Sequence, residues 1–157
     1  MKIRVVCIGK TGKSFLAEAE AYYMNRLKHY ISFEKIEIPD IKQTKRLSEE
    51  EIKYKEGLVI LAKIPASDRV ILLDENGKSF SSVGFSQYMQ QQFNRGGQGL
   101  TFVIGGPYGF SEDVYNRAES KISLSKMTFS HQMIRPIFIE QLYRAMTILK
   151  GEPYHHQ

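Results

Sequence analysis

The chain has a single cysteine, Cys7, and contains no long run of apolar residues. One cysteine cannot form a disulfide within the chain, which excludes a disulfide-stapled scaffold and favours a reducing compartment. Because Cys7 lies within a short apolar run, we expect it to be a small core residue. That run is too short for a signal peptide and no stretch is long enough to span a membrane, so we expect a cytoplasmic protein without a membrane partner.

Internal repeats, low-complexity segments and domain linkers are also missing. The chain has 157 residues, of which 42% are apolar and 25% are charged, an ordinary globular composition. This length suffices for one substantial core, and we predict a single domain over residues 1–157. The net charge of +5 is compatible with binding to a nucleic acid but does not require it.

Strand and helix patterns alternate along the chain. Runs rich in Val, Ile and Leu, or in alternating apolar residues, predict strands over residues 3–8, 33–39, 70–74, 100–104 and 122–124. Apolar residues at three- and four-residue steps predict helices over residues 15–30, 48–63, 85–93 and 133–150, and Ser111 is suited to cap another short helix. This alternation predicts an α/β fold, a parallel sheet with helices on both faces, in which ligands bind beyond the carboxyl ends of the strands.

Several local signals mark where elements begin and end. Ser48 followed by Glu51 is the pattern of a capping box. The residues of 75–78 read Glu-Asn-Gly-Lys, which predicts a turn after the third strand. Pro136 has no N–H, so we expect either a kink at this position or a last helix that effectively begins near Arg135.

The stretch from Gly9 to Ser14 reads Gly-Lys-Thr-Gly-Lys-Ser and invites comparison with a phosphate-binding P-loop. That motif needs a glycine five positions before Gly12, where this chain has Cys7. We therefore predict a plain strand-to-helix turn here rather than a nucleotide triphosphatase site.

Two loops that follow predicted strands have the clearest potential to bind a ligand. Residues 104–110 read Ile-Gly-Gly-Pro-Tyr-Gly-Phe, and residues 124–131 read Leu-Ser-Lys-Met-Thr-Phe-Ser-His. Gly105 and Gly106 have no β-carbon, so a ligand could approach their peptide units, while Met127 and Phe129 offer apolar walls. A glycine pair alone is more often a simple turn.

These two loops, the Glu-Gln-Leu-Tyr-Arg-Ala run at 140–145 and the Pro-Tyr-His ending at 153–155 resemble the RlmH family of SPOUT-type methyltransferases. The resemblance covers essentially the whole chain. It implies a C-terminal trefoil knot that binds S-adenosylmethionine, and methylation of N3 of a pseudouridine in the 23S ribosomal RNA of the large subunit. With so small a chain, the substrate is expected to be the assembled ribosome.

The resemblance also implies particular site residues. The expected contacts of S-adenosylmethionine are Leu73, Gly105, Gly106, Leu124, Ser125, Lys126, Met127, Thr128 and Phe129. Arg144, Tyr154 and His155 are expected to handle the substrate, without a metal. From the residues alone, Arg144 could equally form a helical ion pair with Glu140, and His131 could start a helix or act as the catalytic group.

The C-terminal helix predicts a homodimer. It has apolar residues on nearly all sides, more than the single stripe of an ordinary surface helix, and family members pair through such helices. Tyr154 and His155 follow Gly151 and Pro153, so we expect them on a short tail outside the core.

The chain departs from the family pattern at Ser130, where a proline is expected, at Pro136, where an aliphatic residue is expected, and at His156, where Lys or Arg is expected. Two other functions remain open from the sequence. One is a non-catalytic ribosome-binding or assembly protein of the same fold, and the other is an unrelated α/β enzyme that binds a nucleotide.

Overall fold

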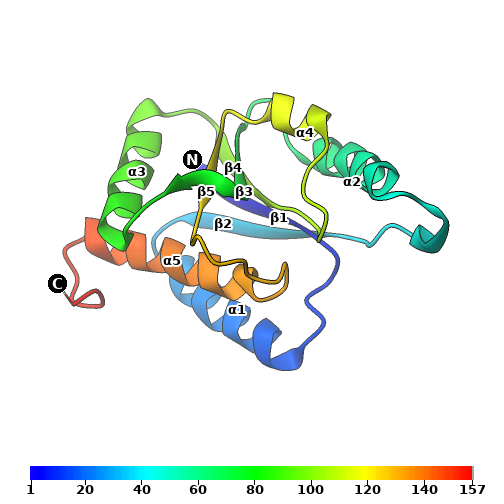
Figure 1. Ribbon diagram of the computed structural model, residues 1–157. Coiled ribbons are helices and arrows are strands. Elements are labelled where there is room, and N and C mark those ends of the chain that lie inside the picture. Colours follow the sequence, from blue (N-terminus) through cyan, green and yellow to red (C-terminus); the bar gives the residue numbers. More distant parts are fainter. Residues whose placement is uncertain (157) are drawn as a thin grey trace.

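The computed structural model describes residues 1–156 and has one parallel five-stranded sheet (Figure 1). The strands are β1 (Lys2–Ile8), β2 (Ser32–Ile38), β3 (Arg69–Ser79), β4 (Gly99–Ile104) and β5 (Ser120–Ser123). Their order across the sheet is β2-β1-β4-β3-β5, so β4 is the central strand, between β1 and β3. The predicted α/β fold with a parallel sheet is confirmed.

Helices cover both faces of this sheet (Figure 1). They are α1 (Ser14–Leu27), α2 (Glu49–Lys63), α3 (Ser82–Arg95), α4 (Glu112–Arg117) and α5 (Ile134–Leu149), with the 3₁₀ turn η1 at Thr44–Arg46. α1, α3 and α5 pack on one face, and α2 and α4 pack on the other. Within residues 1–156 no helix combines the length and the apolar character needed to cross a lipid bilayer.

The two faces of the sheet form two core clusters. Cys7 and Phe102 contribute to the cluster under α1, α3 and α5, whereas Ile8 and Val103 contribute to the cluster under α2 and α4. Successive strand residues point to opposite faces, which is why adjacent apolar residues in β1 and β4 serve different cores. Cys7 is fully buried, as predicted, and burial raises the pKa of its thiol to about 11.

The predicted helix starts are confirmed at three places. The Glu51 N–H donates to Ser48 Oγ at 3.2 Å, and the Glu51 carboxylate accepts from the Ser48 N–H, which completes the capping box of α2. Ser111 Oγ caps α4. α5 begins at Ile134, so Pro136 lies in its first turn, where a helical N–H has no intrahelical partner. The proline therefore costs this helix no hydrogen bond.

The end of the third strand differs from the prediction. Residues 75–78 do not form a turn, because β3 continues to Ser79 after a register shift beyond Leu73. Lys78 and Ser79 pair with Ile122 and Ser123 of β5, and a β-carbon on Gly77 would lie only 2.5 Å from the Ile122 backbone. The Asn-Gly signal was outweighed by pairing with a strand more than forty residues later. α1 also ends earlier than predicted, at Leu27.

Candidate functional site

A cavity of about 360 Å³ opens at the carboxyl ends of β3, β4 and β5. Its walls come from the end of β3, the glycine loop after β4, the segment after β5, and the approach to α5. These lining residues are Leu73–Asn76, Ile104–Phe110, Tyr115, Ile122–Ser125, Met127–Phe129, His131 and Ile134. The position agrees with the rule that parallel sheets bind ligands beyond the carboxyl ends of their strands.

The structure brings together almost all the predicted cofactor residues. Every one of them except Lys126 lines the cavity, and the Lys126 side chain is exposed. Sequence reasoning missed Asp74, Glu75 and Tyr115 as lining residues. The two acids directly follow the buried part of β3, so the carboxyl-end rule could have found them. Tyr115 comes from α4, and no local signal predicts that its ring reaches the cavity.

The cavity has an acidic character. Of the lining groups that belong to the described residues, Asp74 and Glu75 are the only carboxylates, and no lysine or arginine is among them. Burial, together with the nearby Arg135, lowers the pKa of His131, so its imidazole is neutral at pH 7. The Tyr115 hydroxyl donates to Asp74, and burial followed by this bond raises the pKa of Tyr115 to about 12.

Neighbouring protein groups lie close to where β-carbons would stand on the two glycines after β4. A β-carbon on Gly105 would lie 2.9 Å from the Phe110 ring, and one on Gly106 would lie 2.7 Å from the carboxylate of Glu56. On both glycines, the α-hydrogen that a β-carbon would replace therefore faces a neighbouring side chain. The missing β-carbons therefore have a packing reason within the protein, and the expectation that they also make room for a ligand stays a prediction for these two lining residues.

The segment after β5 is held by its own side chains and by β3. Ser123 Oγ donates to the Ser125 carbonyl oxygen at 2.8 Å, and Ser125 Oγ accepts from the Met127 N–H at 2.9 Å. Thr128 Oγ1 donates to the Glu75 carboxylate at 3.2 Å, which joins this segment to the end of β3. These bonds give residues 123–128 a defined backbone beside the cavity.

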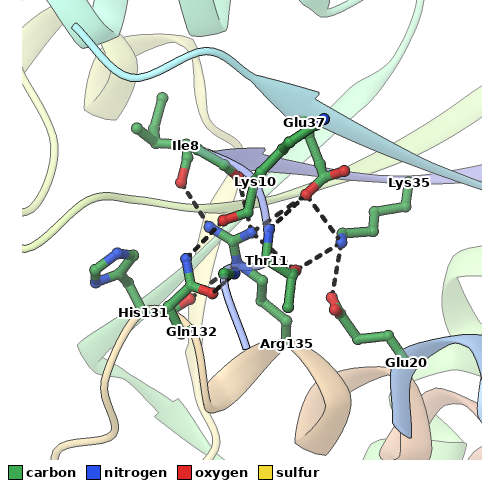
Figure 2. A network of polar contacts seen from close by, with 11 residues as sticks. Ile8, Lys10, Thr11, Glu20, Lys35, Glu37, His131, Gln132 and Arg135 are labelled. Atoms are coloured by element: carbon green, nitrogen blue, oxygen red, sulfur yellow. Dashed lines mark hydrogen bonds and ion pairs between the residues drawn. The ribbon is translucent and has the colours of Figure 1, made fainter. Parts of the chain in front are cut away.

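Arg135 anchors the start of α5 to the end of β1 (Figure 2). Its side chain is 1% exposed. The guanidinium donates to the carbonyl oxygens of Ile8, Gly9 and His131 at 2.5, 2.8 and 3.0 Å. The chain before α5 is therefore fixed against the sheet. Sequence reasoning treated Arg135 only as a possible helix start, and an arginine in a helix carries no local sign of burial.

Further bonds strengthen this attachment (Figure 2). Gln132 accepts from the Gly12 N–H at 2.9 Å and donates to the Lys10 carbonyl oxygen at 3.0 Å. Glu37 accepts from the Thr11 N–H at 2.7 Å and lies 3.8 Å from Arg135. The Gly9–Ser14 stretch is thus a strand-to-helix turn that hydrogen-bonds to Gln132 and Arg135. This agrees with the prediction that it is not a P-loop.

A second polar cluster lies at the other end of α5. Arg144 donates to Glu140 at 2.7 Å and to His155 Nδ1 at 2.9 Å. The Tyr154 hydroxyl donates to the same Glu140 oxygen at 2.9 Å, and the Arg144 guanidinium lies 4.7 Å from the centre of the Tyr154 ring. An arginine only donates, so His155 Nδ1 accepts and the proton of the neutral ring is on Nε2.

The tail makes more contacts with the rest of the chain than the sequence indicates. Tyr154 packs against the core cluster, with its ring 4.7 Å from that of Tyr143, and burial together with the bond to Glu140 raises its pKa. Tyr154 thus lies on a tail after α5, as expected, and its partly buried ring packs against the core without being part of it. The helical ion pair of Arg144 with Glu140 is present, and it coexists with the contact to His155.

The two sites do not meet within one chain. Ile134 lines the cavity, whereas Arg144, Tyr154 and His155 do not. Arg144 is ten residues after Ile134, which corresponds to about 15 Å along the axis of α5.

Comparison of the sequence with known proteins identifies the family to which the chain belongs. The family model described as "Predicted SPOUT methyltransferase" matches residues 1–155. A relative from Christiangramia forsetii is 62% identical over the full length of both chains, and relatives from Flavobacterium johnsoniae and Parabacteroides distasonis are each 58% identical over the same extent. All three are named Ribosomal RNA large subunit methyltransferase H. The chain belongs to the RlmH family of SPOUT methyltransferases.

Two departures from the RlmH pattern have a local explanation. Ser130 Oγ accepts from the Met133 N–H at 3.0 Å, so this serine supports the turn that leads into α5. Pro136 fits the first turn of that helix. His156 is exposed, and no described contact explains its presence. The trefoil knot that membership of the RlmH family implies stays a prediction.

Proposed function

We propose that the protein is an S-adenosylmethionine-dependent methyltransferase that methylates N3 of a pseudouridine in 23S ribosomal RNA, in the assembled ribosome. The observation that carries this proposal is the acidic cavity at the carboxyl ends of three strands, which Asp74 and Glu75 line without a lysine or arginine among the described lining groups. The names of its relatives support the RNA substrate.

The residues present fit the cofactor. S-adenosylmethionine is a nucleoside joined to a sulfonium cation, and it supplies an electrophilic methyl group when bound. The carboxylates of Asp74 and Glu75 favour a cation and oppose the phosphates of ATP or NAD. Leu73 and Phe129 offer apolar surface for the adenosine, and the backbone of residues 124–128 and of Gly105 and Gly106 offers hydrogen-bonding groups.

Arg144, Tyr154 and His155 are assigned to the target base. The Nε2 atom of His155 is buried and has no hydrogen-bond partner among residues 1–156, so its N–H would be free to bond a ligand once a movement of the tail exposes it. The nitrogen to be methylated carries a proton, and the guanidinium of Arg144 would stabilise the ring once that proton is lost. Tyr154 holds Glu140, and through it Arg144, in position.

A second copy of the chain would unite the two sites. Arg144 lies about 15 Å along α5 from Ile134, the residue of this helix that lines the cavity of its own chain. An antiparallel pair of α5 helices would place the Arg144 cluster of one protomer near the cavity of its partner. Much of the apolar surface of α5 is buried within its own chain against α1 and α3, so the separation of the sites supports the homodimer better than the helix pattern does. Sedimentation as a monomer at micromolar concentration would contradict the pairing.

Calorimetry tests the cofactor. The protein is titrated with S-adenosylmethionine, NAD and ATP, and only the first is expected to bind. Binding of NAD or ATP instead would favour a nucleotide enzyme of another kind.

Mass spectrometry tests the reaction. Ribosomal RNA from a strain that lacks the gene is expected to lose one methyl group on a pseudouridine, which returns with the parent gene but not with an Arg144→Ala gene. Unchanged RNA in the deletion strain would favour a non-catalytic ribosome-binding protein.

A further inference from the structure

One buried carboxyl group outside the cavity has no role in the proposed reaction. Glu56 lies on α2, is 5% exposed, and does not line the cavity. Its Oε1 atom has no hydrogen-bond partner in the part of the chain that the structure describes. An isolated buried carboxyl group costs folding free energy, and more so when it is ionised.

The position of Glu56 on its helix makes the cost plain. Ile52, Glu56 and Ile60 follow one another at four-residue steps and are 7%, 5% and 2% exposed. They form the buried face of α2, where an apolar residue would be the ordinary choice. A polar residue that breaks such a pattern without a partner is expected where a structure serves function at the expense of stability.

The Glu56 carboxyl group lies directly behind the cofactor loop. A β-carbon on Gly106 would be 2.7 Å from Glu56 Oε2 and 3.0 Å from Oε1. Gly106 does not have a positive φ, so backbone conformation does not require glycine there. Glu56 therefore contacts the outer side of a residue whose inner side lines the cavity.

We propose that Glu56 is a positioning residue of the cofactor pocket, whose carboxyl group supports the Gly105–Gly106 backbone from behind. This inference rests on the proposed function, because the ligand of the pocket is S-adenosylmethionine. Burial, and then the nearby Asp40 carboxylate, raise the pKa of Glu56 above its ordinary value, which favours the neutral form at this contact.

The first test separates positioning from stability. In Glu56→Leu the buried carboxyl group is replaced by an apolar side chain of similar size, so the melting temperature is expected to stay level or rise. The affinity for S-adenosylmethionine, measured by calorimetry, is expected to fall by at least about tenfold because the loop loses its support. Glu56→Gln keeps the shape of the side chain and is always neutral, so its affinity for S-adenosylmethionine should fall by no more than about threefold. Lys55→Ala, at an exposed position on the same helix, is the control.

The second test measures the contact itself. Gly106→Ala is expected to weaken the binding of S-adenosylmethionine by about tenfold. The double variant Gly106→Ala/Glu56→Ala should lose less affinity than the losses of the two single variants multiplied together, since the smaller side chain at position 56 makes room for the new methyl group. Gly12→Ala is the matched control, because a β-carbon there meets no atom within 4 Å.

Equal affinity of Glu56→Leu and the parent would overturn the positioning role, as would strictly additive effects in the double variant. If the parent itself does not bind S-adenosylmethionine, the proposed function fails first and the inference fails with it.

Discussion

Arg135 donates through Nη1 to the carbonyl oxygen of Gly9 at 2.8 Å, across 126 residues of the chain. The bond joins the first turn of α5 to the end of β1, and the residues just before and within that turn, His131 and Ile134, line the cavity. A single side chain thus connects the core of the sheet to a wall of the candidate site.

Replacing Arg135 is expected to cost much of the stability of the fold. In Arg135→Met the carbonyl oxygens of Ile8 and Gly9 lose their donors, and each unsatisfied buried acceptor costs about 1–3 kcal/mol. Urea unfolding should show a loss of about 3 kcal/mol or more. Arg135→Lys should retain only part of the stability of the parent, because a lysine ammonium lacks the planar arrangement of N–H donors of a guanidinium. The exposed Arg46→Ala is the control, and a loss no larger than in this variant would contradict the prediction.

The same network predicts a dependence of stability on pH. Partial burial tends to raise the pKa of the Glu37 carboxyl group, but the Thr11 N–H and Lys35 outweigh it and lower that pKa. A lowered pKa means that the contribution of Glu37 is present above the pKa of the unfolded state, about 4.3, and is lost as pH falls through the folded value. The difference in unfolding free energy between the parent and Glu37→Gln should therefore be largest near neutral pH and shrink toward about pH 3. A constant difference across this range would argue against the prediction.

Gly105→Val is expected to abolish cofactor binding through a clash with protein. Its β-carbon would lie 2.9 Å from the Phe110 ring, so the glycine loop, which forms one wall of the cavity, must shift. Calorimetry should detect no binding of S-adenosylmethionine at concentrations that saturate the parent. Gly105→Val/Phe110→Ala should recover part of the affinity by making room. If the single variant binds like the parent, the pocket is elsewhere.

Removal of residues 154–157 should separate binding from methylation. The truncated chain loses the bond from Tyr154 to Glu140 and the contact with Tyr143, so it should be less stable by about 1–3 kcal/mol. Its affinity for S-adenosylmethionine should be unchanged, since no described residue of the tail lines the cavity. Methyl transfer to ribosomes should be lost, and Arg144→Ala should behave alike. Retained methylation would show that other residues handle the substrate, with His131 the next candidate.

Mixing two inactive variants tests whether the site is shared between protomers. Gly105→Val damages only the cavity, and Arg144→Ala damages only the cluster at the far end of α5. If each site combines one cavity with the partner's Arg144 cluster, mixed dimers contain one intact site and regain part of the parental activity. Mixtures without activity, despite proven subunit exchange, would place both parts of the site in the same chain.

The sequence by itself determined the elements and most of the lining of the candidate cavity. Apolar periodicity predicted the five strands and the main helices, and the capping box placed the start of α2, because these signals act between residues close in the chain. The pocket was predictable since its loops follow strands of a parallel sheet, whose carboxyl ends share one edge. Leu73, Gly105 and the segment from Leu124 to Phe129 meet there, and only Lys126 lies off the wall.

The tertiary structure alone decided which distant residues touch. Residues 75–78 extend β3 because β5 supplies partners, Arg135 is buried because the carbonyl groups at the end of β1 need donors, and Tyr154 is held by Glu140. It also placed the Glu56 carboxyl group 2.7 Å from where a β-carbon on Gly106 would stand. Each of these pairs a residue with one far along the chain, and periodicity or local propensity reports only on neighbours, so the physical cause lies outside the window that a sequence pattern covers.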